Sequence, residues 1–425
     1  MDKIVDNYVK KGTSIEKFIS EIKEMDDLTE QVSIDLRNCS ILHHEVFVSQ
    51  EKVENPEDYM WFTRLGAGEA SKQKVPHVKI KKASLYTALS KELIKEIENN
   101  KTILYDENKK IMYLMSKYTF ATLLPKLRLQ GESLLIPSRA RDIFLASVFA
   151  EMSGNVKILT RKVDAKHKKV FAVFSDKHDS MPLMAINNVL DVIRAITRCE
   201  GSRWEVSQEM SEIYVTLPDM TERISDDVYT PGIRISISDI GRSALNIQGF
   251  WKYNDTYAVF NVPITKFKRF SLDDENFWND YMRIIRETID IIMDSFESHK
   301  FITKMREFQN YDLLPLETTD YHNNENCLKN QEIFLNIVDY IIQESGVRTA
   351  VGRKRTNQFV RDLTTFTDWS IPYTFYDAIK TVLDFPMSDI DSLSVRNNLV
   401  VALGTVPYMN VDKINEVCVC RNVAI

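Results

Sequence analysis

Short strand-like runs separated by turn residues fill the middle third of this chain, and they constrain its fold more than any other feature. Two runs, VKILTRKV and KKVFAVFS, flank residues Asp164–His167, which is the pattern of a β-hairpin. Further runs rich in β-branched and aromatic residues follow at Glu212–Leu217, Ile233–Ser238, Ala244–Phe250 and Thr256–Val262. Because connections as short as Pro231-Gly232 join antiparallel neighbours, we expect a central, mostly antiparallel sheet.

Helical periodicity dominates the sequence on both sides of this segment. Apolar residues recur at helical spacing in the stretches 15–22 and 84–99, and Ser14 is placed to cap the first of them. A longer stripe predicts a helix over 274–308, and shorter ones follow at 331–343, 373–383 and 392–403. Within the middle third, we expect Asp179 or Ser180 to cap a helix that runs from Met181 to about Cys199.

These patterns predict an α+β fold, with a central mostly antiparallel sheet flanked by helical N- and C-terminal regions. A chain of 425 residues is long enough for several domains, and we expect three regions. They are a mostly helical N-terminal region at 1–130, a central α+β domain at 131–310 and a helical C-terminal region at 311–425. The polar run TTDYHNNEN, which begins at Thr318, is the expected linker.

The charge balance argues against a histone-like nucleic-acid binder, whose whole surface would be basic. The net charge is −6, although local clusters of charge decide such contacts. Five scattered cysteines do not form a disulfide framework, which favours a reducing compartment such as the cytosol of a bacterial host. The first residues lack the apolar core of a signal peptide, and no apolar run is long enough for a membrane span. We therefore expect a cytoplasmic protein with no membrane partner.

No motif for catalysis, a cofactor or a metal stands out in the sequence. Gly66 and Gly68 form a G-x-G without the third glycine, the preceding strand or the downstream acid of a dinucleotide site. His178 titrates near neutral pH, but its acidic neighbours are typical of a polar connection and no nucleophile is evident. We expect no cofactor, metal or catalytic residue. A metal-dependent nuclease is a minor alternative, for which the candidate carboxylates are Asp219, Glu222, Asp226 and Asp227.

Basic residues with aromatic neighbours are the strongest functional signal. The predicted hairpin at 157–169 carries six Lys or Arg against one acid, Asp164, and the stretch 348–361 carries five with no acid. Cations bind phosphates irrespective of base sequence, and aromatic rings beside them stack on unpaired bases. The candidate nucleic-acid-binding residues are Arg161, Lys162, Lys166, Lys168, Lys169, Trp251, Tyr253, Lys266, Lys268, Arg269, Arg353, Lys354 and Arg355. The alternative is that the charges form a solvated face and the aromatic residues belong to the core.

Three segments resemble a family of phage/plasmid-like proteins of unknown function. They lie within residues 85–379 and read KVFAVFSDKHDSMPLMAINNVLDVI, ISISDIGRSALNIQGFWKYNDTYAVF and TDWSIPYTFYDAI. The resemblance implies a phage or mobile-element context but no reaction, because the family has no settled activity. The chain departs from the family at Lys252–Asp255, where members often carry Cys-x-Asn-Gly. The order of hairpin and helix is also similar to that of RecT-like and related single-strand annealing proteins.

Two classes of function follow from these observations. The first is a non-enzymatic nucleic-acid-binding protein of a phage or mobile element, which forms oligomers and acts on single strands in annealing or protection. The alternative is a virion structural or assembly protein, or a phage inhibitor of a host defence system, whose partner would be a phage or host protein. Both classes predict self-association or partner surfaces rather than catalytic chemistry.

Overall fold

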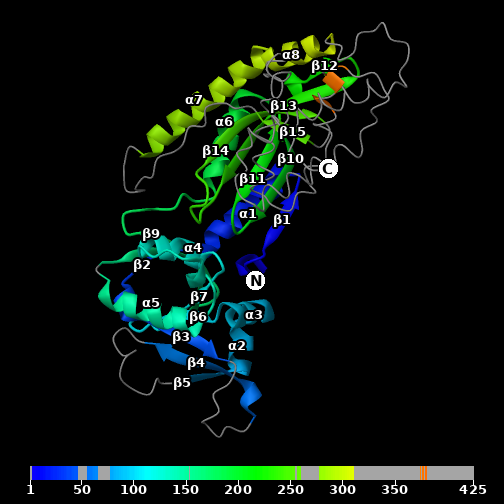
Figure 1. Ribbon diagram of the computed structural model, residues 1–425. Coiled ribbons are helices and arrows are strands. Elements are labelled where there is room, and N and C mark those ends of the chain that lie inside the picture. Colours follow the sequence, from blue (N-terminus) through cyan, green and yellow to red (C-terminus); the bar gives the residue numbers. More distant parts are fainter. Residues whose placement is uncertain are drawn as a thin grey trace, which may run out of the picture.

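Two β-sheets, each covered by helices, form the described part of this protein in a computed structural model (Figure 1). The structure describes residues 2–45, 55–65, 77–152, 154–253, 256–259 and 277–310, together with positions 374, 376, 377, 379 and 380. The α+β fold class predicted from the sequence is confirmed, with helices near both ends of the described chain. The sheet content is divided between two sheets, where the sequence predicted one in the centre.

The first sheet has eight strands in the order β2-β8-β9-β7-β6-β3-β4-β5. Neighbours are antiparallel except for β7 and β9, which run parallel. The strands are β2 (Thr29–Ile34), β3 (Cys39–Glu45), β4 (Tyr59–Leu65), β5 (His77–Lys81), β6 (Thr102–Asp106), β7 (Ile111–Met115), β8 (Val156–Lys162) and β9 (His167–Ser175). The predicted basic hairpin is confirmed as β8–β9, in which Leu159 lies opposite Ala172.

Helices cover both faces of the first sheet. The pair α2 (Lys82–Ala88) and α3 (Lys91–Asn100) packs on one face, and α4 (Thr119–Lys126) and α5 (Arg139–Glu151) pack on the other. Successive residues of β6 point to opposite faces, so Ile103 joins the core under α2 and α3 while Leu104 joins the core under α4 and α5. Most residues of β3 and β4 are buried on both faces, so neither strand shows the regular alternation of polar and apolar residues.

The second sheet follows the order β1-β10-β11-β13-β14-β15, and β12 pairs with β13. All its pairs are antiparallel. The strands are β1 (Val9–Gly12), β10 (Glu200–Ser207), β11 (Ser211–Thr216), β12 (Glu222–Ile224), β13 (Asp227–Ile237), β14 (Asn246–Tyr253) and β15 (Thr256–Val259). The antiparallel sheet predicted from the middle third is therefore found here.

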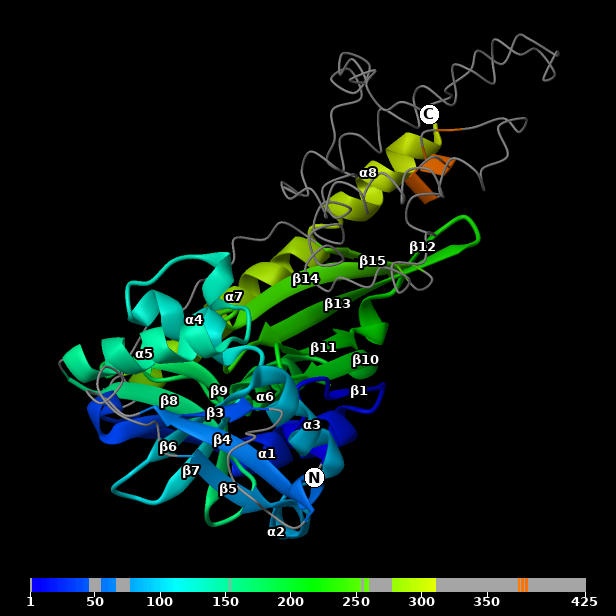
Figure 2. The same ribbon diagram turned by 60° about the horizontal axis from the view of Figure 1, so that its bottom comes forward.

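Four of the described helices pack against the second sheet. They are α1 (Ile15–Leu28), α6 (Ala185–Ile196), α7 (Phe277–Glu297) and α8 (Lys300–Gln309). Ile22 of α1, Ile193 of α6 and Ile289 of α7 meet Ile213 and Ile235 of the sheet in one buried core. Figure 2 shows α7 running along the sheet beside β14. None of the described helices has the length and apolar character needed to cross a membrane.

Short 3-10 helices complete the described elements: η1 (Asp2–Ile4), η2 (Leu36–Asn38), η3 (Pro56–Asp58), η4 (Glu132–Leu134) and η5 (Pro218–Met220).

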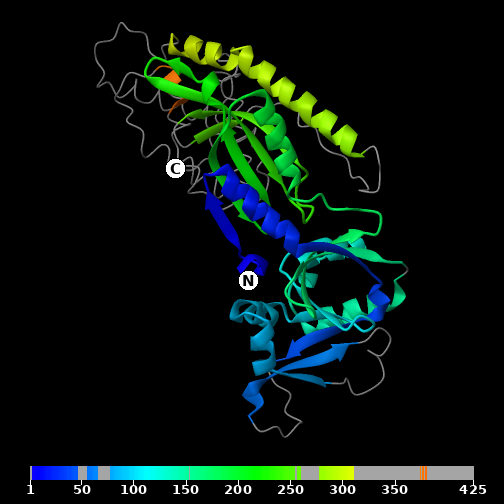
Figure 3. The same cartoon turned by 180° about the vertical axis from the view of Figure 1, so that it is seen from behind.

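Residues 1–130 contain more β structure than the sequence predicted. Strands β1 to β7 all fall in this range, so the expectation of a mostly helical region is wrong for its secondary structure. The chain begins with β1 and α1 on the second sheet and enters the first sheet only at β2. Figures 1 and 3 show the N-terminus lying between the two sheets. The predicted boundary at 130 remains a prediction, and the expected helices and linker beyond 310 lie outside the described residues, apart from the five single positions.

The start of α6 also differs from the prediction. The helix begins at Ala185, and neither Asp179 nor Ser180 caps it. Asp26 of α1 accepts hydrogen bonds from the backbone N–H groups of Leu183, at 3.0 Å, and Met184, at 2.7 Å. The carboxylate that accepts hydrogen bonds at the N-terminus of α6 therefore comes from a segment distant in sequence. Asp179 instead forms an ion pair with Lys157 at 2.6 Å.

Candidate functional site

The β8–β9 hairpin, which carries five of the predicted binding residues, lies where the two sheets meet. Arg161 is fully buried. Its guanidinium lies 2.7 Å from the Asp239 carboxylate after β13, donates to the side chain of Gln208 and sits 4.3 Å from the centre of the Phe171 ring. A buried guanidinium is tolerated because such partners replace water. Arg161 therefore joins the sheets and is not exposed for a phosphate.

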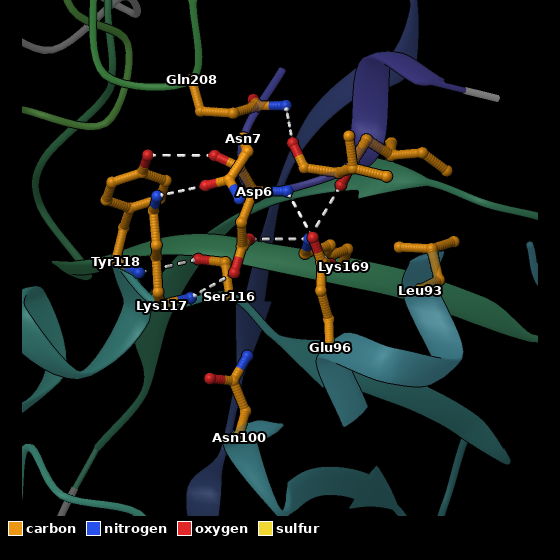
Figure 4. Close-up of polar contacts among 12 residues, drawn as sticks. Asp6, Asn7, Leu93, Glu96, Asn100, Ser116, Lys117, Tyr118, Lys169 and Gln208 are labelled. Carbon is orange, nitrogen blue, oxygen red and sulfur yellow. Dashed lines mark hydrogen bonds and ion pairs between the residues drawn. The ribbon is translucent and has the colours of Figure 1, made fainter. Parts of the chain in front are cut away.

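Lys169 has the same structural role on β9 (Figure 4). Its ammonium lies 2.7 Å from Asp6, contacts Glu96 and donates to the carbonyl of Ile4 at 2.9 Å. Burial raises the pKa of the Glu96 carboxyl, and the charge of Lys169 opposes that rise. The prediction that Lys169 contacts nucleic acid is therefore wrong for this structure, because the side chain is buried among its partners.

The same network holds the first residues of the chain in the junction (Figure 4). The backbone N–H of Lys117 donates to the Asp6 carboxylate at 2.9 Å, and the Tyr118 hydroxyl donates to the Asp6 carbonyl at 3.0 Å. From the second sheet, the side-chain amide of Gln208 donates to the carbonyls of Lys3 and Val5, both at 2.8 Å. Both sheets therefore bind the N-terminal segment.

The other three predicted binding residues of the hairpin differ in their exposure. Lys168 is largely buried and forms an ion pair with Glu30 of β2. Lys162, at the end of β8, and Lys166, in the turn, are exposed. Of the five predicted binding residues on the hairpin, those two remain accessible to a polyanion.

Trp251 and Tyr253 belong to the core of the second sheet. The Trp251 ring is 1 % exposed and stacks on Phe301 of α8, with ring centres 5.1 Å apart. Tyr253 stacks on Tyr229 at 5.2 Å. Because α7 and α8 cover this face, these rings cannot stack on bases, and their prediction as base-binding residues is wrong for this structure. The remaining predicted residues lie outside the described part of the chain: Lys266, Lys268, Arg269, Arg353, Lys354 and Arg355.

A buried polar cluster between α5 and the first sheet escaped the sequence reasoning. His43 Nδ1 lies 2.7 Å from the Asp142 carboxylate, which also accepts from the Thr102 hydroxyl at 2.8 Å and from Arg141 Nε at 2.8 Å. These side chains are all buried. Because these side chains bond to one another across α5, β3 and β6, the cluster is a polar contact inside the fold.

Two of the four acidic residues considered for a nuclease are engaged in other contacts. Glu222 forms ion pairs with His299, at 2.8 Å, and Arg306, at 3.4 Å, while Asp227 lies 2.8 Å from Lys380. Within the described ranges, no group of three or more His, Cys, Asp or Glu side chains is arranged to hold a metal ion.

A cleft between β1 and the start of α1 brings basic residues together in a way the sequence reasoning missed. Its volume is about 400 Å³, and its lining includes Lys10, Lys11, Gly12, Thr13, Ser14, Lys17, Ser20 and Trp204. Ser14 caps α1 as predicted, accepting a hydrogen bond from the backbone N–H of Lys17 at 3.2 Å. The run KKGTSIEK contains the signal, because three lysines flank a helix cap within eight positions.

Gly12 allows the strand to lie directly over the Trp204 indole. A side chain at position 12 would place its Cβ 2.6 Å from Trp204 Cζ2, which is far inside van der Waals contact. The indole is buried and forms a wall of the cleft. Glycine at this position therefore lets β1, with its lysines, approach β10 closely.

The lysines of the cleft differ in their electrostatic environment. Lys10 pairs with Glu21, which also pairs with Lys3, and Lys11 lies 3.2 Å from Glu205. Lys17 is exposed, and its ammonium has no carboxylate partner among the described residues. The N-terminus of α1 adds a partial positive charge to the same place.

Comparison with known proteins identifies no relative, since no family model, no curated protein and no solved structure matches this chain. The resemblance to phage/plasmid-like proteins remains a prediction from three segments.

Proposed function

We propose that this protein is a non-enzymatic nucleic-acid-binding protein that holds backbone phosphates in the cleft between β1 and α1. The observation that carries this proposal is the convergence of Lys10, Lys11 and Lys17 on one open cleft at the N-terminus of α1. Exposed ammonium groups and a helix N-terminus both attract phosphate oxygens. The exposed hairpin cations Lys162 and Lys166 extend the positive charge available on the surface.

The chemistry of the cleft supports binding without base recognition. Lys11 and Lys17 reach solvent on flexible stems and act as point charges, which suits phosphates in varied positions. The Trp204 ring is 3 % exposed, so its face is not offered to a base. We therefore expect salt-sensitive, sequence-independent binding.

Two further elements of the proposal come from the sequence. The preference for single strands was based on Trp251 and Tyr253, and their burial removes that support, so the experiment compares both forms of nucleic acid. The context of a phage or mobile element acting in the bacterial cytosol follows from the family resemblance and the scattered cysteines.

Fluorescence anisotropy with labelled single- and double-stranded DNA and RNA, titrated over salt concentration, tests the proposal. The double variant K11Q/K17Q should bind more weakly, and the slope of log affinity against log salt should fall by about 1–2, since each phosphate contact contributes about 0.7–0.9. Lys23→Gln is the matched control, because Lys23 is an exposed lysine of α1 outside the cleft lining. Wild-type protein that binds none of these nucleic acids at low salt would contradict the proposal. So would a K11Q/K17Q variant with the affinity and salt slope of wild type.

An assembly protein is the second candidate, because α5 exposes apolar side chains to solvent. Such a surface is typical of a protein that binds another protein chain.

A further inference from the structure

The outward face of α5 is apolar where a surface helix is normally polar. Leu145 and Phe149 point into the core, while Ile143 and Phe144 are 36 % and 43 % exposed. Four of the ten large apolar side chains exposed in the described chain lie in or just before this helix, and they are Leu135, Ile136, Ile143 and Phe144. These four lie within ten positions of the chain, whereas the other six are scattered along it.

The charges of this face lie only at its two ends. Arg139 is the first residue of α5 and Glu151 is the last, and both are exposed. Between them the solvent-facing positions are Ala140, Ile143, Phe144 and Ser147, none of which carries a charge. Figures 1 and 2 show α5 packed along the first sheet, and its residues Ile143 and Phe144 are exposed to solvent.

We propose that a second copy of this chain docks on this face through its own α5, antiparallel and related by a two-fold axis. In an antiparallel pair centred near Leu145, Arg139 of one copy lies at the same height as Glu151 of the other, and the reverse pair forms by symmetry. The apolar residues Ile143 and Phe144 then meet their counterparts near the axis. The pattern of charges is therefore complementary to itself, as a two-fold interface requires.

Existing contacts do not prevent this pairing. Arg139 lies 3.3 Å from Glu45, and its side chain is 51 % exposed, so the guanidinium can exchange or share that partner. Ala140 and Ser147 are small, which lets the two helix backbones approach closely. At 1.5 Å rise per residue, the paired helices overlap over about 20 Å. Leu135 and Ile136 extend the apolar area beyond the helix start.

Sedimentation velocity on the full chain, over a range of protein concentrations, tests this surface. Wild type should dimerise, and Phe144→Glu should weaken the dimer at least tenfold because the axis would bring two carboxylates together. Ile291→Glu is the matched control, since Ile291 is a 53 % exposed apolar side chain on α7 and should leave the dimer intact. A wild type that stays monomeric, or a dimer that Phe144→Glu leaves unchanged, would overturn the proposal.

Charge reversal tests the antiparallel arrangement separately. Arg139→Glu and Glu151→Arg should each weaken the dimer, and the double variant R139E/E151R should restore it, because each interface would regain two opposite-charge pairs. A double variant no better than either single one would overturn this register. Far-ultraviolet circular dichroism of each variant checks that the fold is retained. The proposal is independent of phosphate binding, because the α5 face and the β1–α1 cleft share no residue.

Discussion

The guanidinium of Arg161 on β8 lies 2.7 Å from the carboxylate of Asp239, and this buried ion pair connects the first sheet to the second. Arg161 also donates to Gln208, whose amide binds the N-terminal segment. The hairpin that looked like a surface for nucleic acid is thus a structural junction. The charges of Arg161 and Lys169 are directed inward because carboxylates from distant segments meet them there.

Breaking this pair should cost much of the stability of the protein. Arg161→Met leaves the Asp239 carboxylate buried without its cation, and the free energy of unfolding should fall by about 3–5 kcal/mol. Lys162→Met, at the exposed neighbouring position, should change it by less than about 0.5 kcal/mol. Urea unfolding followed by circular dichroism measures both. Equal midpoints for the two variants would show that the pair does not stabilise the fold.

Asp26 should make stability depend on pH. Burial raises the pKa of its carboxyl to about 6, although the hydrogen bonds from Leu183 and Met184 oppose this rise. Because the unfolded value is about 3.9, the folded state holds a proton between about pH 4 and 6 that the unfolded state has lost. Stability from this group is therefore present below that window and is lost as pH rises through it.

The variant Asp26→Asn isolates this contribution, because the amide does not titrate. The difference in unfolding free energy between wild type and Asp26→Asn should shift by about 1–3 kcal/mol between pH 4 and pH 7, with wild type losing stability relative to the variant as pH rises. Urea titrations at several pH values measure it. Asp27→Asn, at an exposed neighbour on α1, should show no such shift, and an identical profile for both variants would contradict the prediction.

Gly201→Ala should displace the segment between β1 and α1 that lines the cleft. A Cβ at position 201 would lie 2.1 Å from the carbonyl oxygen of Thr13, so the connection between β1 and α1 must move. We expect a loss of about 1–3 kcal/mol in stability, typical of overpacking, and weaker binding of nucleic acid by the folded protein. Thermal unfolding and anisotropy titrations check the two effects. A variant with both quantities unchanged would mean that this close approach is not needed.

Trp251→Ala should act on the core and not on ligand binding. Removing a ring stacked on Phe301 should lower the free energy of unfolding by about 3–5 kcal/mol, and Trp251→Phe should cost less. Nucleic-acid affinity, measured at a temperature where the variant is folded, should match wild type. A stable variant that has lost its affinity for nucleic acid would instead support the base-stacking role that the sequence predicted for Trp251.

Much of the local structure could be predicted because it depends on short-range patterns. Two strand-like runs flank a polar turn within residues 156–175, Ser14 caps α1, and the stripe of isoleucines in α7 has helical spacing. The strands β3 and β4 were missed because both of their faces are buried, which removes the alternation that identifies a strand. The lysines of the cleft could have been noticed in the run KKGTSIEK, but their convergence depends on the pairing of β1 with β10.

By itself, the sequence determined the α+β class, the basic hairpin and the helix periodicity of this protein, since each depends on residues close together in the chain. Only the tertiary structure decided that there are two sheets, that Trp251 is core, and that Arg161 and Lys169 are internal. The physical reason is that the exposure of a charge depends on its partners. Asp6, Glu96 and Asp239 are far from the hairpin in the sequence, and folding brings their carboxylates to it.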